Sequence, residues 1–136
     1  MSELKELAAE AKHELLTHII PFWRGMRDDK FGGYYGYLSY DLALDEKAEK
    51  GCILNSRITW FFANAYLLYK DGGISEEECE AAGFKGEDLL AEAKHGYEFL
   101  REHCIDKEYG GIFWSLNYDG TPLDTTKHTY NRAFCI

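Results

Sequence analysis

Several features that would place this chain in a membrane, outside the cell or on a metal ion are missing from its sequence. No uncharged run approaches the ~20 residues that a membrane-spanning helix needs, and the first residues lack the basic and apolar regions of a secretory signal. The cysteines form no Cys-x-x-Cys pair, and each lies in or beside an apolar segment. We therefore expect a cytoplasmic protein, without a membrane partner, whose thiols are free and buried. The cysteines are Cys52, Cys79, Cys104 and Cys135.

Positive charge is also scarce. The 15 Lys and Arg residues are outnumbered by 24 Asp and Glu residues, and they are scattered rather than gathered into a stripe. Because the net charge of -9 repels phosphate backbones, nucleic acid is not expected as a partner. A neutral small molecule is the expected ligand. No nucleotide-binding loop, Ser/His/Asp set or metal-ligand spacing occurs, so the sequence predicts neither a cofactor nor a metal.

The chain is about the size of one domain. Its sequence predicts a succession of helices. Apolar residues at helical spacing predict an amphipathic first helix that is capped by Ser2 and disturbed at Pro21. Residues 56–70 are apolar on nearly every side, which predicts a helix buried on several sides. A capping box at Ser75 opens a short helix, and a longer helix is expected over 87–104.

A glycine-rich, aromatic segment occurs twice between these helices. Residues 28–41 and 106–119 align without a gap, and each contains Gly-Gly followed by aromatic residues. Such segments favour short strands or hairpins over helix, and their recurrence indicates an internal repeat of helix, hairpin and helix. The recurring positions are Asp28, Gly32, Gly33, Leu38, Tyr40 and Asp41, matched by Asp106, Gly110, Gly111, Leu116, Tyr118 and Asp119.

The aromatic residues of the two hairpins are candidates for ligand contact. Sugars present apolar C–H faces rimmed by hydroxyls, and flat aromatic surfaces suit them. Phe113 and Trp114 are favoured for this role ahead of Tyr34 and Tyr35. The alternative is that the glycines make tight turns and the aromatic side chains only cover the helices.

Arg57 is the most informative charge. It lies in the first turn of the apolar helix predicted from Ser56, where the helix dipole disfavours a cation. A specific partner is therefore expected. That partner is either a buried carboxylate, such as Asp28 or Asp124, or a substrate oxygen that the guanidinium polarises.

The histidines do not assemble a catalytic site. His13, His18, His95 and His103 fall on predicted helices without metal-ligand spacing, and we interpret them as solvated or core residues. His128 differs only in its place at the start of the last predicted helix.

The last residues, 130–136, begin another apolar helix and stop without a cap or a polar turn. Because domain boundaries are normally polar and flexible, we expect the chain to be truncated at this end. The inward faces of the helices from Ser56 and Thr126 would then lack neighbours, so we expect the chain either to self-associate or to be only marginally stable.

Three segments carry a family resemblance. Residues 55–62 read NSRITWFF, residues 109–120 read YGGIFWSLNYDG and residues 127–134 read KHTYNRAF. In this order they resemble the N-acylglucosamine 2-epimerase family and, within it, the bacterial cellobiose 2-epimerases. The likeness extends over the whole chain but covers only the N-terminal portion of a family member. It therefore implies that residues 1–136 are the N-terminal portion of a single, larger catalytic domain.

The resemblance implies an all-α fold, the N-terminal part of an (α/α)6 barrel whose helix pairs are joined by short Gly/aromatic β-hairpins. It also implies a carbohydrate 2-epimerase that interconverts glucose and mannose at the reducing end of a β-1,4-linked disaccharide such as cellobiose. Ring opening and an enediolate intermediate would carry the reaction. The family's catalytic histidines would lie beyond Ile136, so the chain alone is expected to be inactive.

The same resemblance assigns roles to five residues. Arg57 would contact the oxygens of the reacting sugar, where charge develops in the enediolate. Phe113 or Trp114 would form an aromatic wall, and Phe113 stands where some relatives have tyrosine. Tyr130 and Asn55, which lie in the matching segments, are expected to bind substrate.

Two other functions remain open from the sequence. An (α/α)6 glycoside hydrolase would need two carboxylates flanking the scissile bond, and Asp28, Asp106 and Asp119 are available. A helical-repeat binding module would use the aromatic hairpins to hold a carbohydrate or a protein.

Overall fold

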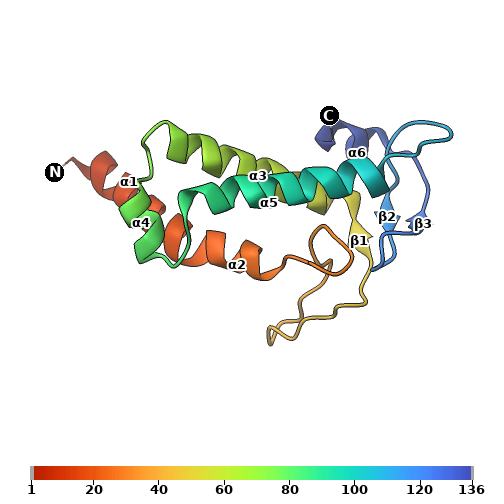
Figure 1. Ribbon diagram of the computed structural model, residues 1–136, viewed down its shortest axis with the longest axis horizontal. Helices are drawn as coiled ribbons and strands as arrows, with labels where there is room; N and C mark the ends of the chain where they lie inside the picture. The colour runs from red at the N-terminus through yellow and green to blue at the C-terminus, as the bar shows by residue number, and fades with distance from the viewer. Residues whose placement is uncertain (1, 136) are drawn as a thin grey trace.

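The computed structural model describes residues 2–135 and is mainly helical, with one small sheet at the end where the chain terminates (Figure 1). Among these residues, no helix is both long enough and apolar enough to cross a bilayer. In chain order the elements are α1 (Glu3–Glu14), the π-helical turn η1 (Leu15–Ile19), α2 (Ile20–Gly25), β1 (Lys50–Gly51), α3 (Cys52–Lys70), α4 (Glu76–Ala81), α5 (Gly86–Phe99), the π-helical turn η2 (Leu100–Cys104), β2 (Ser115–Leu116), β3 (Pro122–Asp124) and α6 (Thr129–Phe134).

The first helix runs through α1, η1 and α2 and only partly packs against the rest. Leu4 and Leu7 of the predicted apolar stripe are 78% and 61% exposed, whereas Leu16 and Ile20 are buried. The helix therefore joins the core through its C-terminal half, and α1 projects from the body (Figure 1).

One detail of this helix differs from the prediction and another agrees with it. Ser2 occupies the N-cap position, but its side chain makes no capping hydrogen bond, and only its carbonyl accepts from the amide of Lys5 at 2.8 Å. The predicted disturbance at Pro21 is confirmed, because the π-helical turn η1 ends two residues before it and the helical path then continues through α2.

Helices α3 and α5 form the centre of the fold, where they run side by side in opposite directions (Figure 1). Ile58 and Phe62 of α3 pack with Leu89 of α5 in the main core. The expectation that α3 is buried on several sides is wrong for residues 2–135, because Trp60 and Leu67 are 69% and 56% exposed. The helix thus buries one face and presents an apolar second face.

The shorter elements follow their local signals. Ser75 accepts from the amide of Glu78 at 3.2 Å and its own amide donates to the Glu78 carboxylate at 2.8 Å, which confirms the capping box. The helical path of α5 continues through η2 to Cys104, as predicted. The cysteines are free, and all but the half-buried Cys135 are buried.

The two repeated Gly-Gly segments form two loops with the same pattern of contacts. In the first loop, the carboxylate of Asp28 accepts from the amides of Lys30 and Phe31, and the Nζ of Lys50 lies 2.6 Å from the second carboxylate oxygen. Gly33 has a φ of 66°, and a Cβ there would lie 2.6 Å from the Oδ1 of Asn55. The close approach and the left-handed backbone together require glycine.

The second loop repeats these contacts. The carboxylate of Asp106 accepts from the amides of Glu108 and Tyr109, and the Nζ of Lys127 lies 2.5 Å from it. Lys127 also donates to the carbonyl of Gly110 at 3.1 Å, as Lys50 does to Gly32 at 2.7 Å in the first loop. The internal repeat predicted from the sequence is therefore confirmed in the geometry of the loops.

The two loops lead into one antiparallel sheet with strand order β1-β2-β3. Gly51 pairs with Ser115, and Ser115 pairs with Asp124 on its other side. The rest of the first connection forms only isolated bridges, such as the pair Leu38 and Leu44, rather than a regular hairpin. The sheet joins the start of α3 to the second loop and so builds one end of the molecule.

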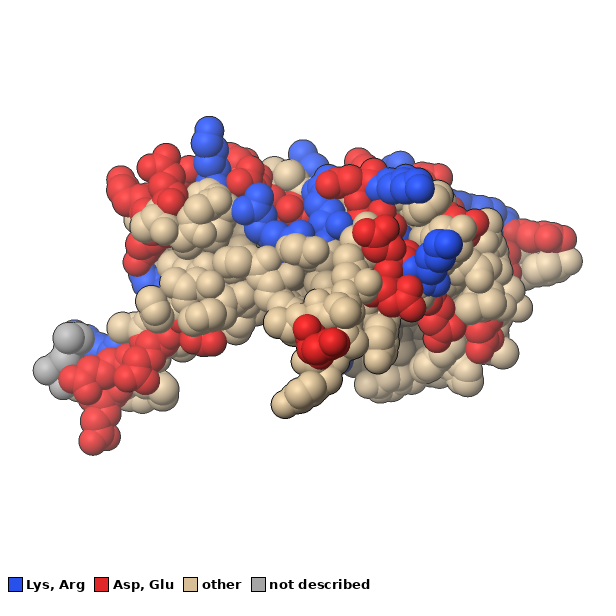
Figure 2. Space-filling view, turned by 90° about the horizontal axis from the view of Figure 1, so that it is seen from below, with Lys and Arg blue, Asp and Glu red and all other residues tan. Residues whose placement is uncertain are grey.

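Charges on the surface are mixed. Figure 2 shows acidic side chains covering the projecting N-terminal helix, and basic side chains interspersed with acidic ones over the body on that face. Lysine and arginine therefore do not form a separate stripe on this face of the molecule.

Candidate functional site

A groove of about 1030 Å³ lies where the sheet, the start of α3 and the end of α6 meet. Its walls are largely aromatic and apolar, with one cation and one carboxylate. The lining residues are Trp23, Glu49, Gly51, Ile53, Leu54, Arg57, Ile58, Trp60, Phe61, Trp114, Ser115, Ala133 and Phe134.

Arg57 supplies the cation. Because α3 begins at Cys52, Arg57 lies in the second turn rather than the first, which corrects the predicted helix start and weakens the argument from the helix dipole. The side chain is exposed, and its guanidinium carbon lies 5.6 Å from the centre of the Phe134 ring. This cation–π contact supports the guanidinium from one side, and Arg57 lines the groove.

The carboxylate partners considered for Arg57 are engaged elsewhere. Asp28 pairs with Lys50, and Asp124 accepts from the hydroxyl of Thr126 at 2.6 Å. Within residues 2–135, Arg57 forms no ion pair and no side-chain hydrogen bond. Its donors are therefore available to a ligand.

The chain's three tryptophans, Trp23, Trp60 and Trp114, all line the groove. Trp114 is held by its backbone, since its amide donates to Asp124 at 2.9 Å and its carbonyl accepts from the amide of Cys52 at 3.1 Å. Its ring packs against His128 at a centroid distance of 4.7 Å, yet 37% of the residue remains exposed. Such a fixed aromatic face can stack on a sugar ring without being reorganised.

Of the predicted site residues, the structure brings together Arg57 and Trp114. Asn55 is fully buried, with its Oδ1 accepting from the amide of Tyr34 and its Nδ2 donating to Gly51, so it positions the first loop. Phe113 packs into the second core cluster beside Lys127 instead of lining the groove.

Tyr130 is 63% exposed on α6, with its ring 4.9 Å from that of Phe134, and it does not line the groove either. Tyr34, the weaker candidate for ligand contact, is fully buried in the main core. Tyr35, the other weaker candidate, is partly buried against the same core.

Sequence reasoning missed Trp60, Phe134 and Glu49 as lining residues. Trp60 could have been found, because it follows Arg57 by three positions and so shares its helix face. Phe134 and Glu49 reach the groove through tertiary contacts that no local pattern indicates.

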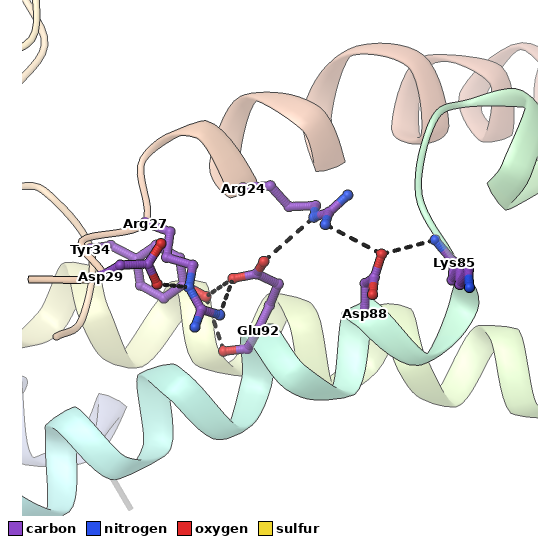
Figure 3. A network of polar contacts seen from close by, with 7 residues as sticks. All are labelled: Arg24, Arg27, Asp29, Tyr34, Lys85, Asp88 and Glu92. Atoms are coloured by element: carbon purple, nitrogen blue, oxygen red, sulfur yellow. Dashed lines mark hydrogen bonds and ion pairs between the residues drawn. The ribbon is translucent and has the colours of Figure 1, made fainter.

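A polar network holds α2 against α5 (Figure 3). The carboxylate of Glu92, 5% exposed, accepts from Arg24 at 3.4 Å and from Arg27 at 3.2 Å. The hydroxyl of Tyr34 also donates to it at 3.1 Å, and burial followed by the charge of Glu92 raises the pKa of Tyr34. The network sets the position of α2 and with it that of Trp23, the residue before Arg24.

The histidines do not line the groove. His95 donates from Nε2 to the carbonyl of Gly33 at 2.8 Å, and His103 lies with Nδ1 3.2 Å from the carbonyl of Gly120. His18 pairs with Glu14 on the surface. His128 reaches the site only through its packing on Trp114. Residues 2–135 also contain no cluster of His, Cys, Asp and Glu side chains placed to hold a metal ion.

Comparison with known proteins adds to this geometry. Residues 33–136 match the family model of N-acylglucosamine 2-epimerase (GlcNAc 2-epimerase). The chain belongs to the N-acylglucosamine 2-epimerase family. The family resemblance predicted from the three sequence segments is confirmed.

Members of this family with assigned activities align over nearly the whole chain. A cellobiose 2-epimerase from Ruminococcus albus is 51% identical over 130 residues, which cover 96% of this chain and 30% of that protein. A cellobiose 2-epimerase from Eubacterium cellulosolvens is 52% identical over 123 residues, which cover 90% of this chain and 27% of that protein. The chain thus spans about three tenths of the length of these curated relatives.

Solved structures of the family share the fold. The crystal structure of a sugar epimerase from a ruminal bacterium superposes with a TM-score of 0.81 at 50% identity, covering 95% of this chain and 29% of that one. The cellobiose 2-epimerase of Bacillus thermoamylovorans gives a TM-score of 0.82 at 38% identity, covering 96% and 30%. The mainly helical fold with a small sheet is therefore that of the matching part of these enzymes.

Proposed function

We propose that this chain is the N-terminal part of a carbohydrate 2-epimerase that interconverts glucose and mannose at the reducing end of a β-1,4-linked disaccharide such as cellobiose. The observation that carries the proposal is the exposed guanidinium of Arg57 in a groove lined by Trp60 and Trp114. Relatives named cellobiose 2-epimerase at about 51% identity support the choice of reaction and substrate.

Arg57 acts on the charge that forms during the reaction. Once the sugar ring opens, the C1 aldehyde makes the C2 proton acidic, and its removal moves negative charge onto the oxygens of an enediolate. A guanidinium with free donors stabilises those oxygens more strongly than the neutral aldehyde, which lowers the barrier. The tryptophan rings hold the apolar faces of the sugar.

Proton transfer at C2 requires groups on both faces of the enediolate. Among the described residues none that lines the groove is a histidine, so we assign the acid and base to groups outside this chain. The proposed whole is an (α/α)6 barrel, in which later helices cover the apolar face of α3 that bears Trp60 and Leu67. Self-association of the isolated chain through that face stays a prediction.

The contacts of the carboxylates favour the epimerase over a glycoside hydrolase. A hydrolase needs two carboxylates that face the substrate. Asp28 and Asp106 are instead paired with lysines inside their loops, and Asp119 accepts from the hydroxyl of Thr121 at 2.7 Å. The three aspartates are therefore structural.

A chimeric enzyme tests the proposed function. This chain would replace the matching N-terminal segment of the Ruminococcus albus cellobiose 2-epimerase, and cellobiose in D₂O would be followed by NMR for deuterium at C2. We expect exchange and epimerisation with the chimera and none above buffer with the chain alone. A folded chimera without activity would contradict the proposal, and exchange by the chain alone would place a proton-transfer group, with His128 the first suspect, within it.

A further inference from the structure

Glu49 supplies the carboxylate of the groove. It directly precedes β1, and successive side chains of an extended segment point to opposite faces. Lys50 is accordingly buried against Asp28, while Glu49 and Gly51 line the groove. The alternation places an exposed carboxylate in the same cavity as Arg57.

The position of Glu49 is defined by two neighbours. A Cβ on Gly36 would lie 1.7 Å from the carbonyl oxygen of Glu49, so the two backbones can approach only because residue 36 is glycine. Ser115, which is 2% exposed, donates from Oγ to the Oε2 of Glu49 at 3.3 Å. Within residues 2–135 the Oε1 accepts no hydrogen bond, and Glu49 forms no ion pair.

The two charged groups of the groove have complementary chemistry. The guanidinium of Arg57 only donates hydrogen bonds, and the carboxylate of Glu49 only accepts them. A sugar hydroxyl does both, so it can donate to Glu49 in a charge-assisted bond. A sugar that itself carries a carboxylate meets like charge at Glu49 instead.

We propose that Glu49 is a sugar-binding residue that accepts hydrogen bonds from substrate hydroxyls and makes the groove prefer neutral over anionic sugars. Ser115 is the positioning residue that orients its carboxylate. This inference rests on the proposed function, because it takes the groove to be the sugar site.

The Glu49→Gln variant tests it with two ligands, cellobiose and its uronic acid counterpart, cellobiouronic acid. Affinities would be measured by NMR titration of the ¹⁵N-labelled chain. Removing the charge should weaken the affinity for cellobiose about fivefold, because a neutral acceptor forms weaker hydrogen bonds. The same substitution should strengthen the affinity for cellobiouronic acid by about the same factor, because the repulsion between its carboxylate and Glu49 is lost. Ser115→Ala should also weaken the affinity for cellobiose, but by a smaller factor than Glu49→Gln.

Glu46→Gln is the matched control. Glu46 lies on the same connection, is exposed and does not line the groove, so this variant makes the same change in net charge away from the site. It should leave the ratio of the two affinities unchanged. If the wild-type chain binds cellobiose but Glu49→Gln leaves the ratio unaltered, the role of Glu49 is refuted while the proposed function stands. If the folded wild-type chain binds neither sugar, the role of Glu49 is refuted, while the activity of the chimera decides the proposed function.

Discussion

Arg57→Ala in the chimeric enzyme is expected to lower kcat for cellobiose epimerisation by roughly 10²- to 10³-fold, the usual effect of removing one group that stabilises a developing oxyanion. The fold should be unchanged, because the side chain is exposed and forms no ion pair within residues 2–135. Steady-state kinetics and circular dichroism would measure the two effects. The main loss should fall on kcat rather than KM, since the charge on the enediolate is absent from the ground state.

Two further variants make this result specific. Arg57→Lys keeps the charge but loses the planar fork, so it should recover only part of the rate. Arg101→Ala removes an exposed arginine that pairs with Glu102 away from the groove, and it should leave kcat near the wild-type value. Near-normal turnover by Arg57→Ala would show that Arg57 does not act in the reaction.

Lys50→Met is expected to give the largest loss of stability in the chain, about 3–5 kcal/mol, which is typical when one partner of a buried ion pair is removed. Lys50 is fully buried, and its Nζ bonds both the carboxylate of Asp28 and the carbonyl of Gly32. The substitution would leave Asp28 charged, buried and without its cation. Urea unfolding followed by circular dichroism measures the free energy of unfolding.

The second copy of the loop provides the control for this prediction. Lys127→Met makes the same chemical change at the equivalent pair with Asp106, but the Lys127 side chain is 27% exposed and water can replace the lost contact. Its cost should be clearly smaller. Equal losses in the two variants would show that burial is not what makes the first pair important.

The same pairs set the response to acid. Burial raises the pKa of Asp28, but the hydrogen bonds from Lys50 and from the amides of Phe31 and Lys30 outweigh it and hold the pKa below the ordinary value. A carboxylate with a lowered pKa stabilises the fold at any pH above its unfolded pKa, and this contribution disappears as the pH falls through the folded value. Lys50→Met should therefore remove part of the acid sensitivity of the chain.

Much of the fold could be predicted because its signals are local. The capping box at Ser75 and the Gly-Gly turns each specify their structure within a few residues. The start of α3 could not be predicted in the same way, since it depends on the bond between the Cys52 amide and the Trp114 carbonyl across the sheet. The first helix forms as predicted, but periodicity shows only that a face is apolar and not whether a neighbour covers it, and Leu4 and Leu7 are exposed.

The candidate site could be predicted only in part from the sequence, for a similar reason. Arg57 and Trp114 stood out, one as a charge in an apolar helix and the other as an aromatic residue beside a Gly-Gly turn. Phe113 was an equal candidate from the sequence, but adjacent residues of an extended segment face opposite sides, and Phe113 turns into the core. Glu49 was missed because β1 is too short for its alternation to be visible in the sequence.

The indole signals of the ¹⁵N-labelled chain test most directly whether this groove is the sugar site. Because Trp23, Trp60 and Trp114 all line the groove, every tryptophan reports on it. On titration with cellobiose, the indole signals of Trp60 and Trp114 should shift and saturate. Binding that saturates elsewhere while the indole signals stay unchanged would contradict the account.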